Sequence, residues 1–188
     1  MKGIIFNLLE ESVTREQGED AWDDLLEQSG IEGAYSSVGS YPDDEFLALI
    51  GALPDSVRAD LDERLRWFGR SSMRSLATRY SVFFAEPKCT AEFLRTLNHI
   101  IHAEVRKLYP GADVPVFDYD LPRFPAQPGS IVLGYSSARR LCALAEGFIE
   151  GAAEQYGETV RIDQPECMHR GDEQCVLVCS IGPGAARA

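Results

Sequence analysis

Residues 130–139 read Ser-Ile-Val-Leu-Gly-Tyr-Ser-Ser-Ala-Arg, an apolar run that passes at once into hydroxyl groups and a cation. Ser130 to Tyr135 has the composition of a strand, and the residues after Arg139 have the apolar spacing of an amphipathic helix. Because Arg is a planar bidentate donor and the hydroxyls are neutral donors, Tyr135, Ser137 and Arg139 suit a pair of carboxylates or phosphates.

A purely structural explanation of this junction stays open. In it, Ser136 or Ser137 caps a helix over residues 138–156, and Arg139 lies along the surface with its charge in water. The two explanations are compatible, because the N-terminus of a helix itself favours an anion.

Further strands flank the junction on both sides. Residues 114–119 predict an edge or irregular strand, because Pro115 cannot donate to a ladder. Downstream, residues 158–162 and 174–181 predict two more strands, with Arg170-Gly171-Asp172 as a hairpin turn between them. The long helix of the junction is therefore inserted among four strands.

The first half of the chain has helical periodicity instead. The expected helices are residues 2–11, residues 15–29 stopped by Gly30, and a short helix from Asp43 or Asp44. A longer helix starts at Pro54-Asp55-Ser56 and has Leu61 and Phe68 on its inward stripe. Another runs from Thr90 or Ala91, and its buried stripe ends with Leu108.

Helices first and strands afterwards indicate an α+β fold with an antiparallel sheet. We expect one domain over residues 1–188, with a helical subdomain over about residues 1–62. It packs on a second subdomain, about residues 63–188, which holds the four-stranded sheet and the long inserted helix.

Charge and hydropathy exclude several classes of partner. The formal net charge is −12 and the sequence pI is about 4.7, which argues against nucleic acid and against an anionic membrane surface. The charge indicates solubility or a docking face for a basic partner. No apolar run is long enough to span a bilayer, and Met1 to Glu11 turns acidic too early for a signal peptide, so we expect a cytoplasmic protein.

The chain has three histidines, and His102 lies at the edge of the apolar stripe of its helix. Such a histidine is commonly structural, and His99, one turn earlier, points elsewhere on the helical wheel. A buried histidine can have another use if Tyr135, Ser137 and Arg139 bind the anionic groups of a molecule, because it can ligate a metal that the same molecule carries. Haem has both an iron and two propionates.

The combination resembles the H-NOX family, the haem nitric oxide/oxygen-binding domains, and in particular its stand-alone bacterial NO sensors. The resemblance covers Met1 to about Ile181. Its ordered elements are Met1-Lys2-Gly3, His102, Leu108-Tyr109-Pro110, Pro115 and Tyr135-x-Ser137-x-Arg139.

The resemblance implies a cofactor site for haem b. In it, His102 would bind the haem iron, and Tyr135, Ser137 and Arg139 would hold the propionates. Pro115 would press on the porphyrin and distort it.

The distal wall is expected from the first helix, with Ile5 and Leu9 as candidates. Oxygen-binding members carry a tyrosine five residues after the motif arginine, and here that residue is Leu144. Bound O₂ gains from a hydrogen-bond donor, whereas NO and CO bind ferrous iron without one. We therefore expect an NO sensor that also binds CO and excludes O₂.

The expected signal is loss of the Fe–His102 bond when NO binds, which would let the His102 helix and the Pro115 contact relax. The family implies a separate partner, a histidine kinase or a cyclic-di-GMP synthase or phosphodiesterase. We identify no nucleophile–base pair, phosphate loop or paired catalytic carboxylates, so we do not expect an enzyme; a haem peroxidase would need a distal acid–base residue.

Four of the five cysteines cluster late in the chain. Cys142, Cys167 and Cys175 match the zinc ligands of zinc-bearing relatives, but the fourth ligand there is a histidine and this chain has Gln164. His169 or Cys179 are candidate replacements. A zinc site, a thiol redox switch and inert buried thiols stay open; a haem-independent thiol or zinc redox sensor using Cys142, Cys167, Cys175 and Cys179 is the alternative function.

Overall fold

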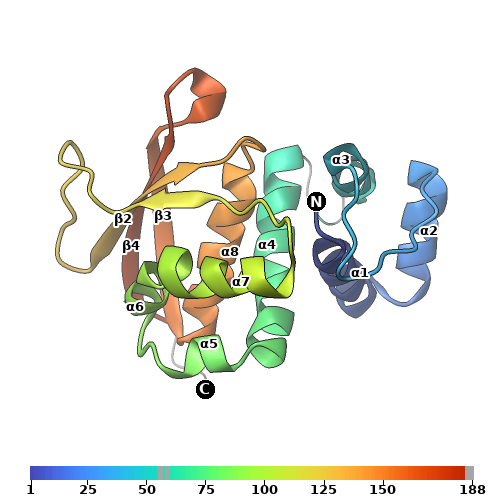
Figure 1. Cartoon of the computed structure of the whole chain (residues 1–188), viewed down its shortest axis with the longest axis horizontal. Coiled ribbons are helices and arrows are strands. Elements are labelled where there is room, and N and C mark those ends of the chain that lie inside the picture. Colours follow the sequence, from blue (N-terminus) through green and yellow to red (C-terminus); the bar gives the residue numbers. More distant parts are fainter. Residues whose placement is uncertain (55–56, 58–59, 185–188) are drawn as a thin grey trace.

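The computed structural model describes residues 1–54, 57 and 60–184, and it shows helices packed beside an antiparallel sheet (Figure 1). This confirms the predicted α+β class. Three helices form the N-terminal part, at the right of Figure 1: α1 (Gly3–Gln17), α2 (Asp20–Ser29) and α3 (Asp43–Ala52).

Glycines set two of these boundaries. The helix predicted over residues 2–11 continues to Gln17 and ends at Gly18, whose φ of 103° ordinary residues rarely adopt. The second helix therefore begins at Asp20 rather than at residue 15, and it stops at Gly30 in the left-handed conformation, as predicted.

Helix α4 (Leu61–Arg79) begins later than predicted from Pro54-Asp55-Ser56, of which Asp55 and Ser56 lie outside the described residues. Its N-cap is Asp60, whose carboxylate accepts a hydrogen bond from the Glu63 N–H at 2.8 Å. Leu61, predicted to face inward, is 45% exposed, because it is the first residue of the helix, directly after the N-cap.

The helix predicted to run from residue 90 to Leu108 is divided. After a short α5 (Val82–Ala85), the chain forms α6 (Thr90–Arg95), a π-helical turn η1 (Leu97–Ile101) and α7 (His102–Leu108). Because the wide turn rotates the following residues, Leu108 does not join the buried stripe as predicted but is 49% exposed.

The sheet consists of β1 (Val116–Asp118), β2 (Ser130–Ser136), β3 (Glu158–Glu166) and β4 (Cys175–Pro183). Its order is β1-β2-β4-β3 and every neighbouring pair is antiparallel. β1 is an edge strand, as Pro115 predicted. β3 extends past residue 162 through a register shift between Asp163 and Glu166, and the single turn η2 (Met168–Arg170) leads to β4.

Helix α8 (Cys142–Gln155) begins four residues later than the predicted residue 138. Between β2 and α8 the chain makes an irregular turn in which Arg140 has a φ of 52°. Neither Ser136 nor Ser137 caps the helix: its N-cap is Leu141, and the Ser137 hydroxyl accepts a hydrogen bond from the Arg139 N–H at 3.2 Å.

Helices α4 and α8 pack side by side (Figure 1) at a distance that glycine permits. A Cβ atom on Gly147 would lie 2.1 Å from the Arg66 carbonyl oxygen, and one on Gly69 would lie 2.5 Å from that of Leu144. The buried Glu146 carboxylate accepts a hydrogen bond from Arg66 Nε at 2.6 Å across this contact.

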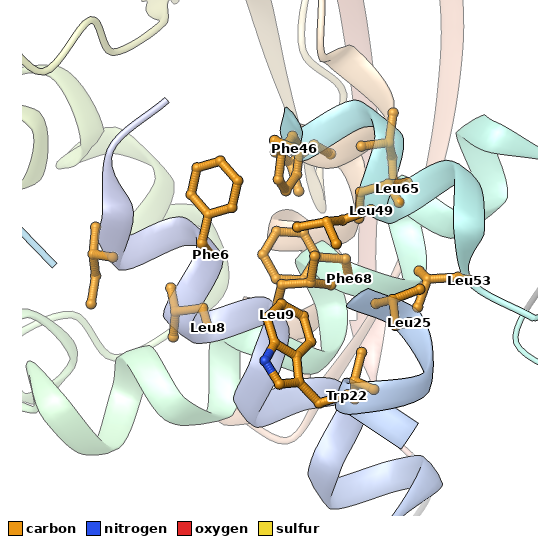
Figure 2. Packing of buried hydrophobic residues seen from close by; sticks show 14 of the residues in the cluster. Phe6, Leu8, Leu9, Trp22, Leu25, Phe46, Leu49, Leu53, Leu65 and Phe68 are labelled. Carbon is orange, nitrogen blue, oxygen red and sulfur yellow. The ribbon is translucent and has the colours of Figure 1, made fainter. Parts of the chain in front are cut away.

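Buried residues form two clusters. The first fills the N-terminal helices, where the rings of Phe6, Phe46 and Phe68 meet beside Trp22 (Figure 2). The second lies between the sheet and α6 and α8. Helix α4 contributes Phe68 to the first cluster and Met73 to the second, so the subdomain boundary near residue 62 stays a proposal.

A search of the described residues for a helix of sufficient length and apolar character to cross a bilayer found none.

Candidate functional site

A cavity of about 380 Å³ lies between the two clusters, and we call it the central cavity. Its walls come from α1, the end of α4, η1, α7, β1, β2 and α8, and they are mainly apolar. Of the predicted haem-site residues it brings together His102, Pro115, Tyr135, Ser137, Arg139, Ile5 and Leu144.

Leu9 does not line this cavity. It is fully buried in the first cluster and faces the aromatic core of Figure 2, although Ile5, one helical turn earlier, lines the cavity. Ile4 and Leu8 line the cavity together with Ile5. We therefore correct the expected distal wall by replacing Leu9 with these two residues.

His102 follows directly after the π-helical turn, a local irregularity that is frequent at functional sites. Its Nδ1 atom is buried without a hydrogen-bond partner among the described residues, and its ring lies against that of Phe117 with centroids 5.8 Å apart. A buried nitrogen without a partner is costly in an apolar wall, so this imidazole is suited to an additional ligand contact.

The electrostatics at His102 favour a neutral ring. Burial lowers the pKa of His102 to about 4, and the nearby Arg106 cation acts in the same direction. The Pro115 backbone acts in the opposite direction and raises the pKa, although Nδ1 has no hydrogen-bond partner among the described residues. A neutral imidazole is the form that binds a metal.

Arg139 lies at the rim of the cavity, and its guanidinium already has oxygen partners. Nε donates to Asp43 Oδ2 at 2.8 Å, and Nη1 donates to the Asp113 carbonyl at 2.7 Å and carboxylate at 2.9 Å. The Met1 amino group binds the other oxygen of Asp43 at 2.5 Å. Asp43 and Asp113 were missed by sequence reasoning, because no local pattern links them to Arg139.

The two hydroxyls of the motif sit beside this arginine. Tyr135, at the end of β2, is 3% exposed, and burial raises its pKa to about 12, so it remains a neutral donor at physiological pH. Ser137 follows in the irregular turn, and both residues line the cavity. The clamp predicted from five consecutive residues therefore faces the same cavity as His102.

Two further tyrosines, Tyr80 and Tyr109, line the cavity. Their hydroxyls hydrogen-bond to each other. Burial, followed by the contact with Tyr80, raises the pKa of Tyr109 to about 12. The walls formed by Ile4, Ile5 and Leu144 carry no side-chain donor.

The cysteines form a second candidate site, which we call the thiol triad: Cys142, Cys167 and Cys175. Their sulfur atoms lie within 4.8 Å of one another, with 3.9 Å from Cys142 to Cys167 and 3.6 Å from Cys167 to Cys175. All three are buried, and burial raises the pKa of the Cys142 and Cys175 thiols. Three thiols this close fit a tetrahedral metal that takes a fourth ligand.

The candidate fourth ligands differ in position. His169 is exposed and its Nε2 lies 2.7 Å from the Arg140 carbonyl oxygen, so its ring is engaged outside the triad. Cys179 is buried, but its Sγ lies 3.8 Å from the Leu177 carbonyl and it is not part of the sulfur group. Gln164 contacts Cys142, and its Nε2 is buried without a partner among the described residues.

Comparison with known proteins identifies a family that binds haem, in agreement with the residues that line the central cavity. The family model described as Haem-NO-binding matches residues 2–164. A search of curated proteins found no match. The chain belongs to the Haem-NO-binding family, the H-NOX domains, whose members are haem-binding gas sensors.

Solved structures extend this similarity over the whole fold. A triple mutant of an H-NOX protein from S. oneidensis in the Fe(II) state is 31% identical, with 98% of this chain and 97% of that chain covered and a TM-score of 0.86. The same organism's H-NOX protein in the Fe(II)NO state is 31% identical, with 97% and 99% covered and a TM-score of 0.84. The unliganded Fe(II) H-NOX protein from K. algicida is 25% identical over 100% of both chains, with a TM-score of 0.81.

Proposed function

We propose that this protein binds haem b in the central cavity and senses NO. The observation that carries the proposal is the buried, unpartnered His102 nitrogen in the same apolar cavity as Tyr135, Ser137 and Arg139. His102 would ligate the iron, and the two hydroxyls and the guanidinium would bind the propionates. Bound ferrous haem would supply an iron that takes a neutral imidazole as ligand and binds a diatomic gas.

Haem uptake tests the proposal directly. Protein produced with ample haem should be red, and His102→Gly should lose the haem unless imidazole is supplied to replace the missing ring. His99→Gly is the matched control, because His99 is exposed on the adjoining π-helical turn and does not line the cavity. A colourless wild-type protein would end the proposal.

The apolar wall supports selection among gases. NO and CO do not need a hydrogen-bond donor, and structures of H-NOX proteins from S. oneidensis contain each of them. O₂ does gain from a donor, and Ile4, Ile5, Leu8 and Leu144 offer none. We therefore propose that NO and CO bind and that O₂ is excluded.

Signalling would begin at His102. Release of its imidazole when NO binds would free α7, which leads through Tyr109 to the loop that carries Asp113 and Pro115. Arg139 binds Asp113 and Asp43, so this loop is joined to α3 of the N-terminal part. An intact Fe–His102 vibration in the fully activated NO complex would refute this mechanism.

The recipient of the signal would be a separate protein in the cytoplasm, and the family suggests a histidine kinase or a cyclic-di-GMP enzyme. We propose a sensor rather than an enzyme, because the polar side chains of the predicted haem site, His102, Tyr135, Ser137 and Arg139, are of the kinds that bind an iron and two propionates. Co-purification with the product of a neighbouring gene, followed by assay of that partner with and without NO, identifies it.

The thiol triad favours a second function, a zinc or redox site. Its short sulfur–sulfur distances support zinc bound by Cys142, Cys167 and Cys175. Gln164 or water would complete the coordination rather than His169. Metal analysis of protein purified without chelators should find bound zinc. Cys175→Ser should lose this zinc, whereas the control Cys89→Ser, which changes a cysteine outside the triad, should retain it. Absence of zinc with three titratable thiols would favour a thiol redox switch instead.

A further inference from the structure

The side chain of Asn98 occupies an unusual place at the edge of the sheet. Its Nδ2 donates to the Phe117 carbonyl oxygen at 2.5 Å, and its Oδ1 accepts from the Phe117 N–H at 3.1 Å. Both backbone groups of this residue are therefore satisfied by one amide, in the manner of a neighbouring strand. We call this pair of hydrogen bonds the Asn98 clamp.

The register of β1 explains why the clamp is needed. Phe117 is paired with Tyr135 of β2, while its own N–H and C=O point to the open edge of the sheet. An unpaired buried backbone group costs free energy, and Phe117 as a whole residue is only 6% exposed. Asn98 thus covers the edge of the three-residue strand that follows Pro115.

The clamp connects two parts of the proposed haem site. Asn98 lies in the π-helical turn, four residues before His102, and the Phe117 ring lies against the His102 ring with an interplanar angle of 27°. The Phe117 ring also meets that of Tyr135, with ring centroids 5.8 Å apart. A second contact, from the Tyr119 hydroxyl to the Leu94 carbonyl at 2.5 Å, holds the far end of β1 to α6.

We infer that Asn98 is a positioning residue for His102: it fixes Phe117 and the Pro115 segment to the helix that carries the imidazole, so that ring orientation and β1 move together. The inference rests on the proposed ligation of iron by His102, and it adds the residue that determines how firmly that ligand is held. Without the clamp, β1 would separate from η1, and the His102 ring would lose its fixed neighbour.

The first test uses haem-free protein and is independent of the proposed function. Asn98→Ala should raise the hydrogen-exchange rate of the Phe117 amide about tenfold, the effect of losing one hydrogen bond. Asn98→Asp keeps an acceptor for this amide and should retain most of the protection. His99→Ala, an exposed neighbour in the same turn, should change nothing. If the Phe117 amide of Asn98→Ala exchanges at the wild-type rate, Asn98 does not hold β1 and the inference fails.

The second test uses haem-loaded protein. Asn98→Ala should lower the Fe–His stretching frequency and increase the fraction of the NO complex that has lost His102. Asn98→Asp keeps the hydrogen bond from the Phe117 amide but loses the one to its carbonyl, so it should lie between Asn98→Ala and the wild type. His99→Ala should match the wild type. If Phe117 exchange rises but both spectroscopic readouts stay at the wild-type values, the clamp is merely structural and the inference fails. If wild-type protein takes up no haem, the proposed function fails while the exchange result still decides the clamp.

Discussion

Arg139 binds two aspartates that lie 96 and 26 residues away along the chain. Asp43 belongs to α3 and Asp113 to the loop before β1, so a single guanidinium joins the N-terminal helices to the segment that carries Pro115. Propionates entering the cavity would meet a cation already oriented by two carboxylates. Such pre-orientation reduces the side-chain entropy lost when the ligand binds.

Replacing Asp43 by Asn should produce a pH-dependent loss of stability. Burial opposes ionisation of Asp43, but hydrogen bonds from the Met1 amine and Arg139 outweigh it and lower its pKa. A lowered carboxylate pKa contributes stability above the unfolded pKa of about 3.9, and this is lost as pH falls through the native pKa. Because Asp43 is 40% exposed, we expect about 1 kcal/mol or less at pH 7.

Urea unfolding of wild type and Asp43→Asn at pH 7 and at pH 3 measures this difference. It should be present at the higher pH and shrink at the lower one. Asp44→Asn is the control, because Asp44 is the next residue of α3 and makes no hydrogen bond to Met1 or Arg139 in the described structure. An equal difference at both pH values would show that the Asp43 charge is not responsible.

Leu144 should decide whether O₂ is retained. Ferrous wild-type protein in air should form no stable oxygen complex, whereas Leu144→Tyr should add a donor to the cavity wall and give a detectable one by absorption spectroscopy. Leu144→Phe supplies the same ring without the hydroxyl and should behave as the wild type. A stable oxygen complex of the wild type would point to the Tyr80–Tyr109 pair as a donor and would contradict our proposal.

At the scale of elements, α4 and α8 form the frame on which both clusters pack. The two helices approach closely because Gly69 and Gly147 carry no side chain, and Arg66 binds Glu146 across the contact. Since Leu144 and Phe148 lie on α8, the spacing of this pair also determines the shape of the central cavity.

Gly147→Ala should therefore lower the free energy of unfolding by about 1–3 kcal/mol, because the added methyl group would overlap the Arg66 carbonyl. Gly51→Ala is the matched control: Gly51 lies in α3 with no atom within 4 Å of an added Cβ. There we expect a stabilisation of up to about 1 kcal/mol, as for other helical glycines. Similar effects of the two substitutions in thermal or urea unfolding would contradict the packing argument.

At the scale of the whole molecule, the proposed signal is a change in how the N-terminal helices pack on the rest of the chain. Polar contacts join them: Asp43 of α3 binds Arg139, and along α1 and α4 Glu11 binds Arg79 while Arg15 and Glu16 bind Ser71. Two packed arrangements that differ in such polar contacts can exchange when one bond near the interface is lost.

Pro115→Ala should favour the relaxed arrangement without any gas. We expect faster amide exchange at the start of α1, where the Gly3 N–H donates to the Gly39 carbonyl at 3.1 Å, in the haem-loaded variant than in the wild type. Pro110→Ala removes a proline from the same connection but not from the cavity wall, and it should have no such effect. If all three proteins show the same amide exchange at the start of α1, Pro115 takes no part in the proposed signal.

The sequence alone determined the fold class, the strand and helix on each side of residue 136, and the pairing of His102 with the Tyr135-x-Ser137-x-Arg139 motif. These features depend on apolar periodicity and on side-chain chemistry within a few residues, so they are readable without coordinates. The family was likewise recognisable, because its motifs occur in a fixed order along the chain.

Tertiary structure decided the rest. The choice of Leu8 over Leu9 depends on which side of α1 faces the cavity, and periodicity cannot distinguish two apolar neighbours that are both buried. The π-helical turn before His102, the late start of α8 and the contact of His169 with the Arg140 carbonyl, outside the thiol triad, follow from packing between distant elements. Asn98, Asp43 and Asp113 bind partners 19, 96 and 26 residues away, and only the folded chain brings such groups within hydrogen-bonding distance.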